Sequence, residues 1–390
     1  MKKRIYKYQK IFEYISLLIV AVLLLSPILY FLTYKYEISD INFHTVFASK
    51  FFEVEQQANS ALIAHSAWQL SVIFFQTLIS DFIGKSWKFS AFMVTLFTEI
   101  LTVLIIFFII RKKSNFLFSS LVSLSLMIIQ PIIIMAFIDQ HISLGYIWIN
   151  SYQNPTSYML KPFALLQTYI SIEALSGKQH QFKEIFLLAV SSIIAVFSKP
   201  SFAICLLPGL FILIIWNYFR KIKIDIKTLI FGVFIPSVFF LLWQYFSTYG
   251  LESDSHVIFA PFLVMSKFSS YLFLKFFLSI TFPFIVTVLS FKKSINDIRM
   301  QFGWIIFAVG VFLTYFFAET GWRLVAGNFT WSGQISLFIL FFCCFLYIIE
   351  NQHIYRKKAI VYFTYALHLI SGIYVYLITF TKISPPNPFA

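Results

Sequence analysis

Long apolar runs recur from one end of the chain to the other, and they constrain its fold more than any other feature. As a helix, about 20 apolar residues cross about 30 Å of hydrocarbon, whereas a barrel strand alternates over about 10 residues. The runs in this chain are continuous, so they predict helices. They cover residues 15–32, 61–80, 90–110, 116–138, 156–175, 185–197, 202–219, 229–246, 270–291, 303–317, 335–349 and 360–380. The sequence therefore predicts an all-α, polytopic transmembrane bundle of about 11–12 spans.

The charge pattern agrees with a membrane protein and indicates its sidedness. Only 12% of the residues are charged, against about 25% in soluble domains. The net charge is +14, but the basic residues cluster in short loops beside the apolar runs, so we exclude nucleic acid as a partner. The N-terminus and the basic segments 111–113, 220–227, 292–299 and 356–358 are predicted to be cytoplasmic. Loops 139–155, 247–260 and 318–331, with few or no basic residues, are predicted to be external.

The topology of residues 61–115 holds one conflict. Two runs separate the first external loop from the basic cluster at Arg111, where opposite sides require an odd number of spans. Either one run is not a full span or the Arg111 cluster is external. We expect run 61–80 to be incomplete, because it contains His65, Ser66, Gln69 and Gln76. That leaves about eleven true spans.

The first external loop carries candidate catalytic residues. Asp40 and His44 are four residues apart, so a helix would place them on one face. A carboxylate there could act as a general base or hold a divalent cation such as Mg²⁺ or Mn²⁺. The alternative is a solvated loop whose acidic residues only keep it outside. An interfacial helix is indicated by the spacing of Phe43, Phe47, Phe51 and Val54.

Two Lys-Pro pairs lie in apolar surroundings and suggest an anion site. Asn154 and Pro155 are typical of a helix start, where anions bind readily, and Lys161 follows in the same helix. Lys199-Pro200 should break the chain between two apolar runs, because residues before proline avoid helical geometry. The two lysines could clamp a phosphate. Alternatively, both could extend to the membrane interface.

One further external loop, AETGWRLVAGNFTW, contains a single basic residue, Arg323. Arg323 could bind a phosphate or pair with Glu319. The chain contains no phosphate-binding loop, dinucleotide fingerprint, nucleophile elbow or spacing typical of a tetrahedral metal site. The sequence therefore gives no sign of nucleotide hydrolysis and indicates no cofactor other than the divalent cation, Mg²⁺ or Mn²⁺, that an aspartate could hold.

Four features of the first half of the chain form one pattern: Asp40 with His44, ALIAHSAW, SYQNPTSYMLKPF and SKPSFAICLLPGL. This pattern resembles that of GT-C superfamily glycosyltransferases, which are polytopic membrane enzymes. The resemblance covers residues 36–220, and 221–390 would add C-terminal transmembrane helices to a single integral membrane domain, 1–390. Many relatives carry a second acid beside the first, where this chain has Ser39, so metal dependence stays open.

The resemblance implies transfer of a sugar from a polyprenyl-phosphate donor at the outer face of a bacterial cytoplasmic membrane. The acceptor would be a glycan, a lipid or a protein. Asp40 and His44 would be catalytic, and the substrate-binding residues would be Asn154, Lys161, Lys199 and Arg323.

Other functions stay open at this stage. A transporter or flippase of a lipid-linked or anionic substrate would use the same broken helices and lysines, although such proteins usually show an internal repeat. A polymerase or ligase acting on lipid-linked glycans would depend on Arg323 more than on Asp40. A non-catalytic scaffold would need neither residue.

Overall fold

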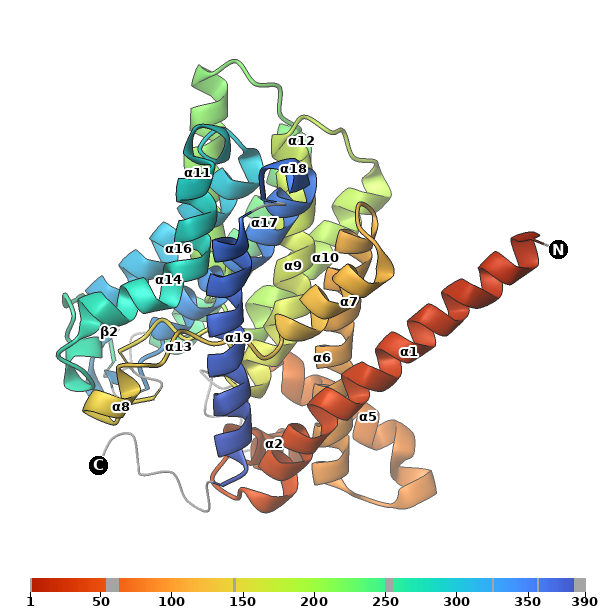
Figure 1. Cartoon of the computed structure of the whole chain (residues 1–390). Coiled ribbons are helices and arrows are strands. Elements are labelled where there is room, and N and C mark those ends of the chain that lie inside the picture. The colour runs from red at the N-terminus through yellow and green to blue at the C-terminus, as the bar shows by residue number, and fades with distance from the viewer. Residues whose placement is uncertain are drawn as a thin grey trace.

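The computed structural model describes residues 2–53, 63–142, 145–249, 255–324, 326–355 and 358–381. Within these residues the chain is almost entirely helical (Figure 1). The exception is a two-stranded antiparallel sheet of β1 (Val257–Phe259) and β2 (Phe317–Glu319), in which Val257 pairs with Glu319. The predicted all-α, polytopic membrane architecture is confirmed.

Among the residues described, seven helical segments are long and apolar enough to cross a membrane. Several other predicted runs form helices that are shorter or more polar. These are α5 (Ala67–Ile83), α9 (Pro155–Leu175), α10 (Phe182–Ser198) and α11 (Ala203–Phe219). Five of the seven apolar segments are single helices: α6 (Trp87–Arg111), α14 (Leu272–Leu289), α16 (Ile298–Phe316), α17 (Thr330–Glu350) and α19 (Ala359–Thr379). The segment Ile11–Lys35 combines most of α1 (Lys2–Tyr30) with η1 (Phe31–Lys35). The segment Ile226–Tyr249 combines α12 (Ile226–Leu229), η2 (Ile230–Phe234) and α13 (Ile235–Tyr249).

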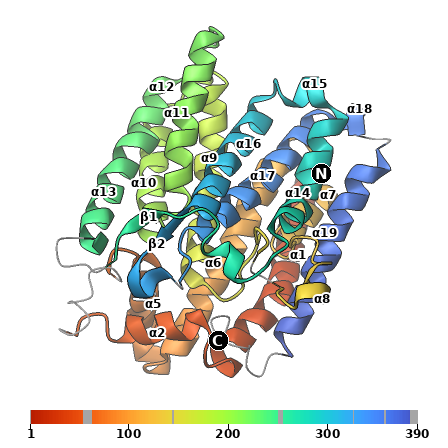
Figure 2. The ribbon, with the colours of Figure 1, turned by 90° about the vertical axis from the view of Figure 1, so that its left-hand side faces the viewer.

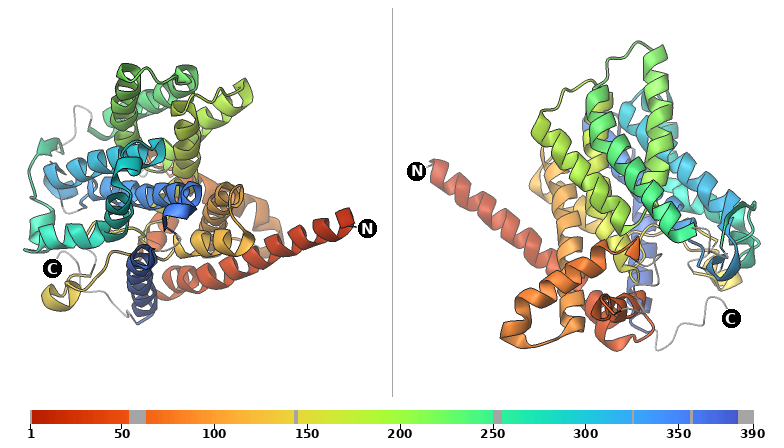
Figure 3. Two further views of the ribbon diagram at one scale, coloured as in Figure 1. Left: turned by 45° about the horizontal axis from the view of Figure 1, so that its top comes forward. Right: turned by 180° about the vertical axis from the view of Figure 1, so that it is seen from behind.

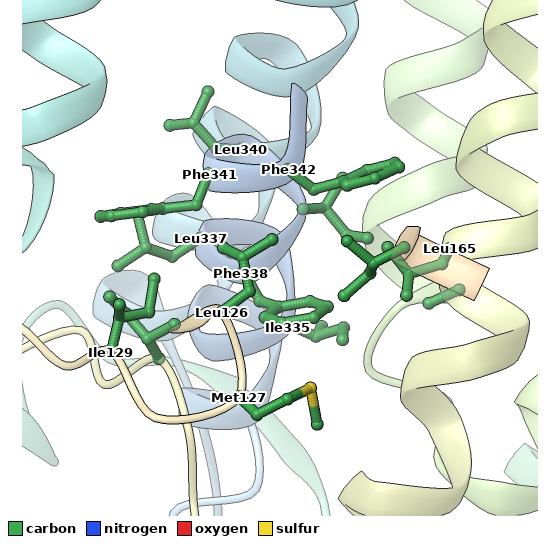
Figure 4. Close-up of a cluster of buried hydrophobic side chains, with 14 of the residues drawn as sticks. Leu126, Met127, Ile129, Leu165, Ile335, Leu337, Phe338, Leu340, Phe341 and Phe342 are labelled. Carbon is green, nitrogen blue, oxygen red and sulfur yellow. The ribbon is translucent and has the colours of Figure 1, made fainter. Parts of the chain in front are cut away.

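Helix α17 forms the centre of the bundle. Almost all of its residues are buried, and they pack with Leu126, Met127, Ile129 and Leu165 from other segments (Figure 4). Helix α16 lies directly against α17, because Gly310 has no side chain. A Cβ atom at Gly310 would lie 2.1 Å from Ser336 Oγ. A helix that is apolar on all sides is typical of the interior of a bundle, and α17 has this character.

Run 116–138 does not form the predicted transmembrane helix. Helix α7 (Phe116–Ser125) ends early, and a non-helical stretch, residues 126–135, leads through turns and irregular backbone to the short α8 (Ala136–Asp139). Pro131 has no N–H, and it disfavours helical geometry at Gln130. Partners elsewhere satisfy the backbone: Gln130 N donates to His368 O at 3.2 Å, and Ile132 N donates to Leu278 O at 3.2 Å. Non-helical backbone at membrane depth is tolerated only when it is satisfied in this way.

Basic residues from different segments meet at one end of the bundle. Lys113 and Arg299, from two segments predicted to share a side, both contact Glu350, with Arg299 Nη1 3.0 Å from its carboxylate. Helices α12, α15 (Phe291–Ser294) and α18 (Gln352–Tyr355) lie at this end, and α2 (Asp40–Ser49) lies at the other (Figure 2).

Helix α5 does not run the length of the bundle. It lies beside α2 and the start of α6 in each view (Figures 1 and 2). Figure 3 shows, by contrast, the first half of α1 extending away from the other helices. The position and 17-residue length of α5 support the interpretation that run 61–80 is not a full span.

Candidate functional site

A cavity of about 1030 Å³ collects most of the predicted site residues. It lies among α2, the start of α9, the link between α10 and α11, the end of α13 and the start of α17. Apolar and aromatic side chains form much of its wall, with polar groups concentrated at a few places, as is usual for ligand sites. Five of the six predicted site residues line it: Asp40, His44, Asn154, Lys199 and Arg323.

Asn154 connects the carboxylate of Asp40 to the ammonium of Lys199. Its Nδ2 donates to Asp40 Oδ2 at 3.2 Å, and its Oδ1 accepts from Lys199 Nζ at 3.2 Å. The same Oδ1 accepts from the backbone N–H of Ser157 at 2.9 Å, so Asn154 is the N-cap of α9 with Pro155 at the first helical position. This confirms the predicted helix start and fixes the amide between two charged groups from distant segments.

Asp40 and His44 share one face of α2, as their spacing predicts. Ser39 caps the helix by accepting from Asn42 N at 3.2 Å, which places Asp40 in the first turn. His44 Nδ1 lies 2.7 Å from Gln69 Nε2 of α5, and this contact orients the imidazole.

The helix that carries Asp40 is shorter than predicted. It ends at Ser49, Phe47 is 3% exposed, and Phe51 follows in a turn. Val54 lies outside the described residues. Phe43, at 61% exposure, is the residue of the predicted apolar stripe that faces outward along the helix. The interfacial helix is therefore a short one that packs part of its apolar face inward.

Burial changes the ionisation of the cavity groups that lie outside the spanning helices. Desolvation raises the pKa of Asp40, although the Asn154 hydrogen bond and the charge of Lys199 oppose this effect. Desolvation, with a contribution from Lys199, lowers the pKa of His44 to about 4. It also lowers the pKa of His65 to about 3, with smaller contributions from Lys199, Arg323 and His44. Both imidazoles are therefore neutral near pH 7.

Lys199 lies at the predicted break between two helices. Its backbone is extended, with φ −166° and ψ 124°, and it precedes Pro200 as the residue that ends α10. Its Nζ lies 3.5 Å from the centroid of the Trp331 ring, a cation–π contact. Burial lowers the pKa of Lys199 to about 7, and the nearby Asp40 charge opposes that shift. The aromatic face and the nearby carboxylate both stabilise the positive charge of this ammonium.

Arg323 pairs with Glu319, one of the two alternatives that the sequence left open. Arg323 Nε donates to Glu319 Oε1 at 2.7 Å. Glu319 is 2% exposed and also accepts from Tyr249 and Asn328. All four side chains line the cavity. The pair forms a second polar group there, separate from Asp40, Asn154 and Lys199 in its contacts.

Lys161, the sixth predicted site residue, does not line the cavity. It is 3% exposed, its Nζ donates to Asn150 Oδ1 at 2.9 Å, and it lies 3.5 Å from Glu99 Oε1. Asn150 in turn donates to the carbonyls of Leu126 and Ile129, which follow α7. Lys161 is committed to this buried network because a charge inside a bundle needs a paired countercharge.

The C-terminal half contributes more than the additional spans that the resemblance implied. Trp331, at the start of α17, and Glu319, at the end of β2, both line the cavity, as does Gln69 in the N-terminal half. Trp331 stands in the largely polar segment GNFTWSGQ, and no local pattern shows that its ring faces a cavity. Gln69 could have been found as a polar residue inside an apolar run.

Neither a group of metal ligands nor a similar protein identifies the function of this site. Within the described part of the chain, no three His, Cys, Asp or Glu side chains gather as a metal site would require. No family model, curated protein or solved structure matches the chain. The interpretation of the site therefore rests on its own geometry.

Proposed function

We propose that this protein is a membrane glycosyltransferase that moves a sugar from a polyprenyl-phosphate donor to an acceptor at the outer face of a bacterial cytoplasmic membrane. The observation that carries the proposal is the Asn154 bridge, which holds a carboxylate and an ammonium together in one large cavity. This arrangement supplies a base and an anion-binding group without a nucleotide-binding loop. The side of the membrane follows from the predicted positive-inside pattern.

The proposed reaction is a direct displacement at the anomeric carbon. The acceptor hydroxyl oxygen forms the new bond to that carbon, and the bond from the carbon to the phosphate oxygen breaks. The acceptor proton passes to the Asp40 carboxylate, and its pKa, raised by burial, suits a general base better than that of an exposed carboxylate. The leaving group departs as polyprenyl phosphate, and Lys199 stabilises the negative charge that develops on it.

His44 and Arg323 have supporting parts in this proposal. His44 is neutral near pH 7 and lies one helical turn from Asp40, where it can hydrogen-bond an acceptor hydroxyl. Arg323 is held in the cavity wall by Glu319, and its guanidinium can donate to a phosphate oxygen in this proposal. Asn154 orients both Asp40 and Lys199.

The test is a transfer assay with purified protein, a polyprenyl-phosphate sugar and a membrane extract as the source of acceptor. Asp40→Asn keeps the size of the side chain but removes the base, so we expect transfer to fall by about 10²–10⁴-fold. Asp81→Asn, at an exposed position that does not line the cavity, is the matched control. Wild-type transfer by folded Asp40→Asn protein would reject the assigned role. Movement of the lipid across vesicles without sugar transfer would indicate a flippase instead.

A further inference from the structure

We infer that Trp331 is the platform on which the sugar ring of the donor stacks, next to a phosphate subsite at Lys199. This inference rests on the proposed function and assigns a place to the sugar. It starts from one contact, the 3.5 Å between Lys199 Nζ and the centroid of the Trp331 ring. In a glycosyl phosphate the phosphate oxygen is bonded to the sugar ring itself. A phosphate on Lys199 therefore brings the ring to the indole beside it.

The indole face suits a pyranose. The C–H groups on one face of a pyranose are weakly electropositive and apolar, and the face of an aromatic ring carries negative charge. Trp331 lines the cavity and is only partly buried, so its ring is accessible from inside. Two amide side chains, Asn328 and Gln334, line the cavity close to Trp331 in the sequence and can bind sugar hydroxyls.

Donor binding would exchange one partner of the indole for another. In this structure the Lys199 ammonium lies over the ring. A phosphate attracts an ammonium more strongly than an aromatic face does, because a full charge replaces a quadrupole. The bound phosphate therefore attracts the Lys199 ammonium away from the indole of Trp331, and the sugar ring stacks on the face of the indole that the ammonium leaves. The carboxylate of Asp40, joined to Lys199 through Asn154, then lies near the reacting carbon.

The arrangement also constrains the substrate class. A stacking platform beside a single lysine suits a sugar joined directly to the phosphate, with one apolar ring face. Trp216 provides an internal comparison, because its ring also faces a cation, Arg220 Cζ at 5.9 Å, but it does not line the cavity. Of these two tryptophans, only Trp331 both contacts a cation and lines the cavity.

The experiment compares the affinities of two lipids for the purified full chain: polyprenyl phosphate and the same lipid carrying a sugar on its phosphate. We expect Trp331→Ala to weaken binding of the sugar-bearing lipid by about tenfold and to leave the sugar-free lipid within about twofold. Trp331→Phe, which keeps an aromatic face, should recover most of the loss. Trp216→Ala should change neither affinity.

The outcomes separate this inference from the proposed function. Equal weakening for both lipids would overturn the inference, because Trp331 would then act only through Lys199 or the prenyl chain. If wild type binds neither lipid, the proposed function itself fails. Should Trp331→Ala not fold, Trp331→Leu and the Phe variant test the same difference.

Discussion

Asn154 and Lys199 are joined by a hydrogen bond of 3.2 Å between the amide oxygen and the ammonium, although the two residues belong to different helix ends. The same amide contacts Asp40 at 3.2 Å through its nitrogen. One asparagine thereby orients both charged groups of the proposed site and also caps α9. Changes at this residue should affect stability and function together.

Asn154→Ala removes the cap and the bridge. Loss of a cap typically costs about 0.5–2 kcal/mol, so we expect a modest fall in the free energy of unfolding, measured by thermal denaturation in detergent. Transfer should fall far more than stability, because Asp40 and Lys199 lose their common partner. Asn154→Ser is the control, since serine restores the cap but not the bridge. Full transfer by the serine variant would contradict the bridging role.

Anion binding should depend on pH through Lys199. Burial lowers the pKa of this ammonium to about 7, so the charged form predominates below that pH and declines above it. Affinity for a phosphodiester lipid, whose own charge is constant in this range, should be highest below pH 7. It should weaken by up to about tenfold per pH unit above pH 7. A binding titration from pH 6 to about 9 measures this effect.

The control for that titration is Lys199→Arg, which stays charged throughout the range. We expect this variant to bind the phosphodiester with an affinity that no longer falls above pH 7. A pH dependence that persists unchanged in the arginine variant would assign the titration to another group.

The pair of Glu99 and Lys161 should behave as a buried ion pair. Lys161→Met leaves a buried carboxylate without its partner, which typically costs about 3–5 kcal/mol. The double variant Glu99→Leu with Lys161→Met removes both charges and should recover much of this loss, except for the hydrogen bond from Lys161 to Asn150. Thermal unfolding of the three proteins measures the difference. A double variant less stable than the single one would refute the interpretation.

Gly372 should tolerate no larger residue. A Cβ atom there would lie 1.9 Å from the backbone oxygen of Ile128, so α19 approaches the non-helical stretch, residues 126–135, without space for a side chain. Overpacking of this kind typically costs about 1–3 kcal/mol, and we expect Gly372→Ala to lower the unfolding temperature accordingly. Ile373→Ala, at the neighbouring 42% exposed position, is the control and should have a smaller effect.

Local signals in the sequence located much of the candidate site. The cap at Asn154, the helix break at Lys199 and the four-residue spacing of Asp40 and His44 all depend on neighbouring residues, and the structure has each of them. Long apolar runs likewise predicted the helical membrane architecture, because hydropathy and length are properties of one segment.

Other features depend on partners that sequence reading does not place. Lys161 was assigned to the site, but its countercharge, Glu99, lies on another helix. Trp331 was missed because nothing near it in the chain indicates that Lys199 lies over its ring. An apolar run does not by itself distinguish a helix from buried irregular backbone, so the run 116–138 predicts a helix that continues past Ser125, where the structure has none.

The non-helical stretch, residues 126–135, has a consequence for biosynthesis. Gln130 exchanges hydrogen bonds with His368, which lies 238 residues later in the chain, and the N–H of Ile132 donates to Leu278. Until those residues leave the ribosome, the backbone groups of Gln130 and Ile132 lack these partners, and each unpaired group in lipid costs several kcal/mol. We therefore expect this part of the nascent protein to settle in the bilayer last, after translation of the final helix.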